Sequence, residues 1–130
     1  MDITNEELIE KAKSVVKPKK MKYGFTIADC GSALLTEDGN VYLGASIATP
    51  SGINLCSEQS AMATMITKGE FKIKKIVTVD ESGVILPPCG TCREAMYQID
   101  QNNLETDVII KKDITVKLKD LLPYLWDESL

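Results

Sequence analysis

The first segment with a clear hydrophobic pattern spans residues 4–16. Apolar residues recur there at spacings of three and four, the period of an α-helix with one buried face. Thr4 stands at the start of this segment and Glu7 lies three residues later, which is the capping-box signature of a helix N-terminus. Pro18 disfavours helical backbone in the residue before it, so the helix should end before that position.

Two strand-like segments follow, at residues 26–35 and 40–48. The pair Asp38-Gly39 lies between them and favours a tight turn, because Gly tolerates a positive φ; the pattern therefore predicts a β-hairpin. Residues 57–68 are rich in Ala and Met and end at Gly69. We expect a helix there that crosses a buried core.

The second half of the chain alternates between the two patterns. Residues 73–80, 83–87 and 107–112 predict strands, and residues 90–99 and 117–122 predict helices. The predicted order is αββαβ(β)αβα. Strands that alternate with helices indicate an α/β protein whose sheet is covered on both faces.

Composition narrows the class of protein. A chain of 130 residues, 44% of them hydrophobic, is long enough for one good core, so we expect a single domain over residues 1–130. A net charge of −4 argues against a nucleic acid polymer as partner, since such proteins neutralise phosphates with clustered Lys and Arg. The apolar stretches are short and the start of the chain is acidic, so we expect no membrane association and a cytoplasmic location.

The four cysteines are the candidate chemistry. In a reducing compartment they favour metal binding or catalysis over disulfides. Cys89 and Cys92 open one predicted helix, while Cys56 and Glu58 open another. Three thiolates fill three of zinc's four tetrahedral positions and leave one for water, which Glu58 would serve as a base. Two alternatives remain: a closed four-thiol zinc site that uses Cys30, and a dithiol redox pair.

The spacing of these residues resembles a known family. Cys56-Ser57-Glu58, followed 33 positions after Cys56 by Pro-Cys-Gly-Thr-Cys-Arg (residues 88–93), is similar to the zinc motifs of the cytidine deaminases. Residues 31–44 resemble the first hairpin of that family, and residues 121–123 resemble a segment near its C-terminus. The resemblance implies a three-layer α/β/α fold with a mixed sheet. It also implies a zinc enzyme that deaminates cytidine or deoxycytidine.

The resemblance also implies roles for individual residues. Cys56, Cys89 and Cys92 would hold the zinc, and Glu58 would move the protons during hydrolysis. The carbonyl of Pro87 and the backbone N–H groups of Ser57 and Cys89 match positions that orient the amine and stabilise the intermediate. The family assembles as a homotetramer, although a homodimer is the other possibility here. In that assembly a C-terminal aromatic residue, matched here by Trp126 or Tyr124, reaches a neighbouring active site; the other possibility is that it covers the core of its own subunit.

Four positions depart from the family pattern. Ser46 and Ala48 stand where nucleoside deaminases carry an Asn and a Glu that grip the ribose, Ala28 replaces a Phe close to the base, and Gln59 replaces an Arg that supports the zinc thiolates. A pyrimidine nucleoside is the expected substrate. The alternatives are a modified aminopyrimidine nucleoside such as blasticidin S, and a non-catalytic zinc-stabilised or dithiol redox protein.

Overall fold

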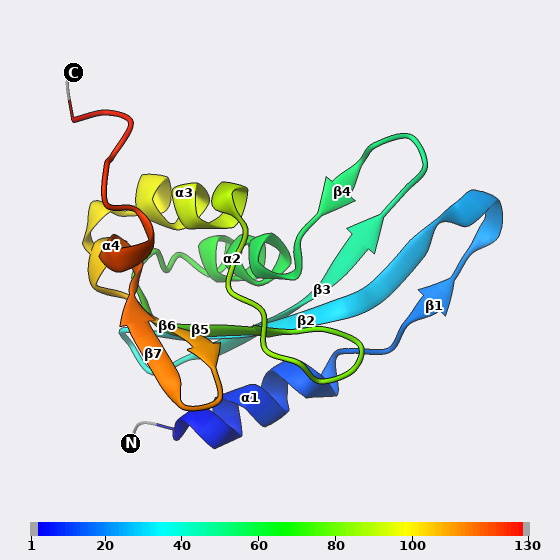
Figure 1. Cartoon of the computed structure of the whole chain (residues 1–130), viewed down its shortest axis with the longest axis horizontal. Helices are drawn as coiled ribbons and strands as arrows, with labels where there is room; N and C mark the ends of the chain where they lie inside the picture. The colour runs from blue at the N-terminus through cyan, green and yellow to red at the C-terminus, as the bar shows by residue number, and fades with distance from the viewer. Residues whose placement is uncertain (1–2, 129–130) are drawn as a thin grey trace.

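A computed structural model describes residues 3–128, and a mixed β-sheet forms its middle layer (Figure 1). The strand order is β4-β3-β2-β5-β6-β7, and β1 pairs with β2. The β5–β6 pair is parallel and the other pairs are antiparallel. The strands are β1 Lys19–Lys20, β2 Thr26–Thr36, β3 Val41–Ala48, β4 Asn54–Leu55, β5 Ile73–Val79, β6 Asp107–Lys111 and β7 Ile114–Lys117.

Helix α1 (Asn5–Ser14) covers one face of the sheet. As predicted, Thr4 is its N-cap, and the Thr4 side chain accepts a hydrogen bond of 3.1 Å from the backbone N–H of Glu7. Leu8, Ile9 and Ala12 of α1 are buried against strand residues. This packing forms the first of two hydrophobic clusters, which lies between α1 and the sheet.

Helices α2 (Ser57–Thr67) and α3 (Gly90–Ile99) cover the opposite face (Figure 1). A second hydrophobic cluster fills the space between them and the sheet, with Met62 and Met65 from α2 and Met96 from α3. The short helix α4 (Leu118–Leu121) closes this cluster through Leu118, which is fully buried. The predicted three-layer α/β/α fold with a mixed sheet is confirmed.

The sheet residues alternate between the two faces. Ala33 and Leu35 of β2 belong to the cluster under α1, whereas Leu34 belongs to the cluster under α2 and α3. Successive side chains of a strand point to opposite faces, so Ser32 lies on the same face as Leu34, beneath α2. This alternation places the Ser32 hydroxyl on the face of the sheet that α2 covers.

The prediction of a strand at residues 83–87 was wrong. The segment forms a loop that runs back beside β5 and contacts it through a single bridge between Val79 and Ile85. The Leu86 N–H donates to the carbonyl of Thr78, but Pro87 and Pro88 have no N–H to continue a ladder. The loop thereby brings the Cys89 region close to the C-terminal end of β5, a central strand of the sheet.

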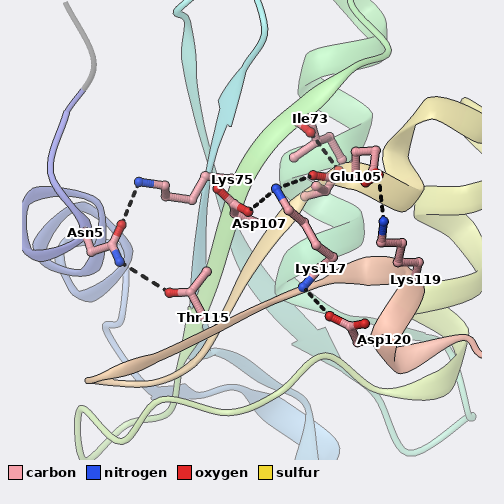
Figure 2. A network of polar contacts seen from close by, with 10 residues as sticks. Asn5, Ile73, Lys75, Glu105, Asp107, Thr115, Lys117, Lys119 and Asp120 are labelled. Carbon is pink, nitrogen blue, oxygen red and sulfur yellow. Dashed lines mark hydrogen bonds and ion pairs between the residues drawn. The ribbon is translucent and has the colours of Figure 1, made fainter.

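Three short strands, β1, β4 and β7, were not predicted. Strand β7 forms an antiparallel hairpin with β6, and polar side-chain contacts join β7 to neighbouring elements (Figure 2). Lys117 pairs with Asp107 at 2.7 Å, and Asn5 of α1 donates to Thr115 of β7 at 3.3 Å. Within residues 3–128, no helix is both long enough and apolar enough to span a bilayer.

Candidate metal centre and active site

Three thiols meet above the sheet. The sulfur atoms of Cys56, Cys89 and Cys92 all lie within 4.8 Å of one another, with Sγ–Sγ distances of 3.8 Å for Cys56–Cys89 and 3.5 Å for Cys89–Cys92. Cys56 is the N-cap of α2, Cys89 is the N-cap of α3, and Cys92 lies in the first turn of α3. The partial positive charge of the two helix N-termini favours thiolates at this point. Three thiolates fit zinc and leave its fourth position open.

The thiols differ in how readily they lose their protons. Burial raises the pKa of Cys56 and of Cys92, and the charge of Glu58 acts in the same direction on both. Burial also acts to raise the pKa of Cys89, but hydrogen bonds from the backbone N–H and side chain of Cys92 and from Cys56 outweigh it, so this pKa is lowered. A metal must therefore displace protons from Cys56 and Cys92, which couples metal binding to pH.

Two side chains support the cluster from outside. The Gln59 Nε2 amide donates to Cys92 Sγ at 3.8 Å, so an uncharged donor stands where the resemblance implied an Arg. Arg93 turns away from the sulfurs: its Nε donates to the carbonyl of Pro88 at 2.7 Å and its Nη1 to the carbonyl of Leu121 at 3.5 Å. These bonds anchor the loop that carries Cys89.

A pocket of about 330 Å³ opens beside the thiols. It brings together most of the residues that the sequence pointed to: Ser46, Ala48, Cys56, Ser57, Glu58, Pro87 and Cys89. Glu58 is only 5% exposed and accepts a hydrogen bond of 3.3 Å from the Ser57 hydroxyl. Among the described residues that line the pocket, Glu58 has the only carboxylate and none is a Lys or Arg.

The pocket also has lining residues that were not predicted to bind substrate. Cys30, Asn54, Leu55, Thr78 and Leu86 also line the cavity, together with Ile47. They come from five separate segments, namely four strands and the loop that carries Leu86, and no local motif marks them. The register of the sheet and the path of this loop bring these positions together.

Cys30 lies in the pocket but outside the group of three thiols. Its backbone N–H donates to the Ser46 hydroxyl at 3.0 Å, at a point where β2 and β3 lose their regular register. Ala28 has a φ of 61° in this irregular stretch and occupies the left-handed region. The four-thiol alternative therefore has no support in this arrangement.

The C-terminal aromatics lie away from this pocket. Trp126 is 60% exposed and Tyr124 is 88% exposed, and neither lines the cavity of its own chain. The segment that carries them follows α4 (Figure 1); its Leu125 packs against the cluster under α2 and α3, and its Asp127 accepts a hydrogen bond of 2.9 Å from the Tyr97 hydroxyl of α3. The two aromatic side chains themselves are mostly exposed and do not cover the core of their own chain, and a role in a neighbouring site stays a prediction.

Comparison with known proteins gives a consistent result. A family model for the cytidine and deoxycytidylate deaminase zinc-binding region matches residues 3–106. A cytidine deaminase from Halalkalibacterium halodurans is 34% identical over 101 residues, covering 72% of this chain and 73% of that protein. One from Mycobacterium tuberculosis is 31% identical over 94 residues, covering 72% and 68%.

Solved structures agree with these matches. The crystal structure of cytidine deaminase from Mycobacterium tuberculosis has a TM-score of 0.80 at 25% identity, over 96% of this chain and 98% of that one. The cytidine deaminase structure from Burkholderia pseudomallei has a TM-score of 0.77 at 26% identity, over 95% and 100%. The similarity thus includes the whole sheet and both helical layers.

Proposed function

Because this chain belongs to the cytidine deaminase family, we propose that it hydrolyses cytidine or deoxycytidine to uridine or deoxyuridine and ammonia. Zinc is its cofactor, and hydrolytic deamination is its class of reaction. One observation carries the proposal: the cluster of three thiols borders, through Cys56 and Cys89, the pocket that the buried carboxylate of Glu58 also lines. A closed structural zinc site needs no such carboxylate beside an open position.

The three cysteines hold the metal in this proposal. Bound zinc would act as a Lewis acid that lowers the pKa of a water molecule toward neutrality. Glu58 is the catalytic acid and base. It accepts a proton from the attacking water and passes it to the ring nitrogen as the oxygen adds to the amine-bearing carbon. It then transfers the second proton to the amine, the carbon–nitrogen bond breaks, and ammonia leaves.

Backbone groups at the pocket orient the substrate. The Pro87 carbonyl is the proposed acceptor for the amine, since Pro87 lines the pocket beside Cys89. The N–H groups of Ser57 and Cys89 are the proposed donors to the reacting ring. Both are at helix starts, where backbone N–H groups have no intrahelical partner.

The walls of the pocket favour an uncharged substrate. Ile47, Leu55 and Leu86 are apolar, and no Lys or Arg of the described residues lines the cavity to pair with a phosphate. Ser46 and Asn54 supply uncharged polar groups at which we place the sugar. A free nucleoside fits this lining better than a nucleotide does. The reaction would serve pyrimidine salvage in the cytoplasm.

We also propose that the enzyme acts as a homotetramer in which Trp126 reaches a neighbouring pocket. The exposure of Trp126 and Tyr124 supports this, because two large aromatic side chains in water are typical of a contact surface. Removal of residues 124–130 should lower turnover far more than zinc content. Equal loss of turnover and zinc would reject the role of the tail.

The test of function is ammonia release by the zinc-loaded protein from cytidine, deoxycytidine, cytosine, dCMP and blasticidin S. Glu58→Gln should abolish release while zinc per chain stays unchanged. Glu81→Gln is the matched control, because Glu81 is an exposed carboxylate outside the pocket, and it should keep full activity.

The panel separates the alternatives. Release from blasticidin S alone would mean that Ser46 and Ala48, in place of the ribose-gripping pair, mark a change of substrate. No release from any compound, with zinc retained, would leave a zinc-stabilised protein without this activity. Reversible oxidation of Cys89 and Cys92 in the absence of zinc would then support the dithiol alternative.

A further inference from the structure

A row of buried hydroxyl groups lies directly behind Glu58. Ser32 of β2 and Thr78 of β5 are register partners, and their hydroxyl oxygens are 2.7 Å apart. The Ser32 hydroxyl also lies 2.7 Å from the Ser57 hydroxyl, which donates to Glu58 Oε1 at 3.3 Å. Ser32 and Ser57 are at most 1% exposed and Thr78 is 5% exposed. The row therefore leads from the sheet to the carboxylate with little exposure to solvent, although Ser57 and Thr78 also border the pocket.

The direction of these hydrogen bonds follows from the donors available. A hydroxyl has one hydrogen to donate. Ser57 uses its hydrogen on Glu58, so in the Ser32–Ser57 contact Ser57 accepts and Ser32 donates. Ser32 has then used its own hydrogen, so Thr78 donates to Ser32. All three hydroxyls point the same way, and each bond polarises the next toward the carboxylate.

The row also determines the rotamer of Ser57. Neighbouring residues on a helix point in different directions, so adjacent side chains do not normally face each other. Ser57 reaches Glu58 only if its hydroxyl is held on one side, and the bond from Ser32 holds it there. Without Ser32, the Ser57 hydroxyl is free to turn to another rotamer.

We propose that Ser32 and Thr78 are positioning residues that act through Ser57 to fix the carboxylate of Glu58 in the pocket. This inference rests on the proposed role of Glu58. The simpler explanation is that three buried hydroxyls only satisfy one another and stabilise the fold. The two explanations differ in what happens when the whole row becomes apolar.

Single substitutions test the end of the row. Thr78→Val keeps the shape of the side chain and removes the hydroxyl, whereas Thr78→Ser keeps the hydroxyl. We expect Thr78→Val to lower kcat for ammonia release from cytidine about threefold to tenfold, with KM within twofold of wild type and zinc per chain unchanged. Thr78→Ser should stay within twofold of the wild-type kcat. An unchanged kcat in Thr78→Val would overturn the proposal.

The triple variant Ser32→Ala/Ser57→Ala/Thr78→Val separates position from stability. Removing one partner leaves a buried hydroxyl without a partner, but removing all three leaves none. The urea midpoint of the triple variant should therefore recover toward wild type relative to Ser57→Ala, while kcat stays at least tenfold below wild type. Recovery of kcat together with the midpoint would reduce the row to a structural role.

A cycle in the metal-free protein tests the inference independently of activity. Thr78→Val and Glu58→Ala alter two side chains that no hydrogen bond joins directly. If Ser32 and Ser57 link them, the double variant's shift in urea midpoint will differ from the sum of the two single shifts. Additive shifts would overturn the inference even if the wild-type protein releases ammonia. Coupled shifts in a protein without activity would reject the proposed function alone.

Discussion

Gly44 of β3 lies where α2 passes closest to the sheet. A Cβ added there would lie 2.3 Å from the carbonyl oxygen of Ser57 and 2.3 Å from the backbone nitrogen of Ala61, whereas ordinary contacts begin at 3.4 Å. Both atoms belong to the helix backbone, so no side chain can rotate to relieve the contact. Gly44→Ala should therefore push the first turns of α2 away from the sheet by about 1 Å.

This shift should affect both stability and chemistry. Overpacking of this kind costs about 3 kcal/mol, which lowers the melting temperature of a domain of this size by roughly 10 °C. The first turn of α2 carries Glu58 and follows its N-cap Cys56, a proposed zinc ligand. A displacement of about 1 Å in catalytic groups reduces turnover roughly 100-fold. We expect both losses in Gly44→Ala.

Two other glycines provide matched controls. At Gly31 an added Cβ meets the carbonyl oxygen of Ala12 in α1 at 2.3 Å, so Gly31→Ala imposes the same clash on the opposite layer. At Gly90 an added Cβ meets nothing within 4 Å, although this residue lies in the sequence between Cys89 and Cys92, two of the clustered thiols. Three measurements compare the variants: thermal melts, zinc per chain and ammonia release at saturating cytidine. Gly31→Ala should lose stability and retain the wild-type kcat, and Gly90→Ala should change little in any of the three. Equal loss of kcat in the Gly31 and Gly44 variants would refute the reasoning.

Three further changes test separate parts of the structure. Gln59→Ala should weaken zinc binding about tenfold in competition with a chelator. An unchanged zinc affinity would show that the contact between the Gln59 amide and Cys92 does not support metal binding. Hydrogen bonds from Thr36 and Tyr42 lower the pKa of Glu70 below 4.5, so their stabilisation is present above that pH and is lost as pH falls through the folded value. The melting temperature of Tyr42→Phe should thus lie below that of wild type at pH 7, and the two melting temperatures should converge in acid. A difference in melting temperature that does not change with pH would contradict this. Asn103→Ala removes three hydrogen bonds, two buried and one partly buried, and should cost about 3 kcal/mol in urea unfolding, far more than the exposed control Asn102→Ala.

The hydrophobic pattern predicted the larger elements because each buries a regular face. The Thr4 cap and the Asp38-Gly39 turn predicted the start of α1 and the β2–β3 hairpin correctly. The pattern failed at residues 83–87, where an apolar run belongs to a loop held against β5. Apolar residues show burial, but a strand also needs N–H groups, and Pro87 and Pro88 have none. Strand β7 was missed because its four residues are too few for a clear period.

Motifs predicted the metal site, but they did not predict the pocket around it. Cys56 with Glu58, and Cys89 with Cys92, each lie in one helix start, so local spacing indicated their common chemistry. The walls depend on the pairing of distant strands. Cys30, for instance, enters the pocket through an irregularity between β2 and β3 that no composition signals.

The same dependence explains why the hydroxyl row escaped sequence analysis. Ser32 is the register partner of Thr78 on one side and of Gly44 on the other, so the three form one line across the sheet beneath α2. Gly44 admits the helix, and the helix then brings Ser57 within 2.7 Å of Ser32. Each member is ordinary by itself, since small polar residues occur in many strands. Their joint effect requires both the close approach of α2 to the sheet and the register of the strands. Gly44→Ala should therefore lower turnover even where zinc remains bound, because it opens the Ser32–Ser57 contact before it separates the thiols.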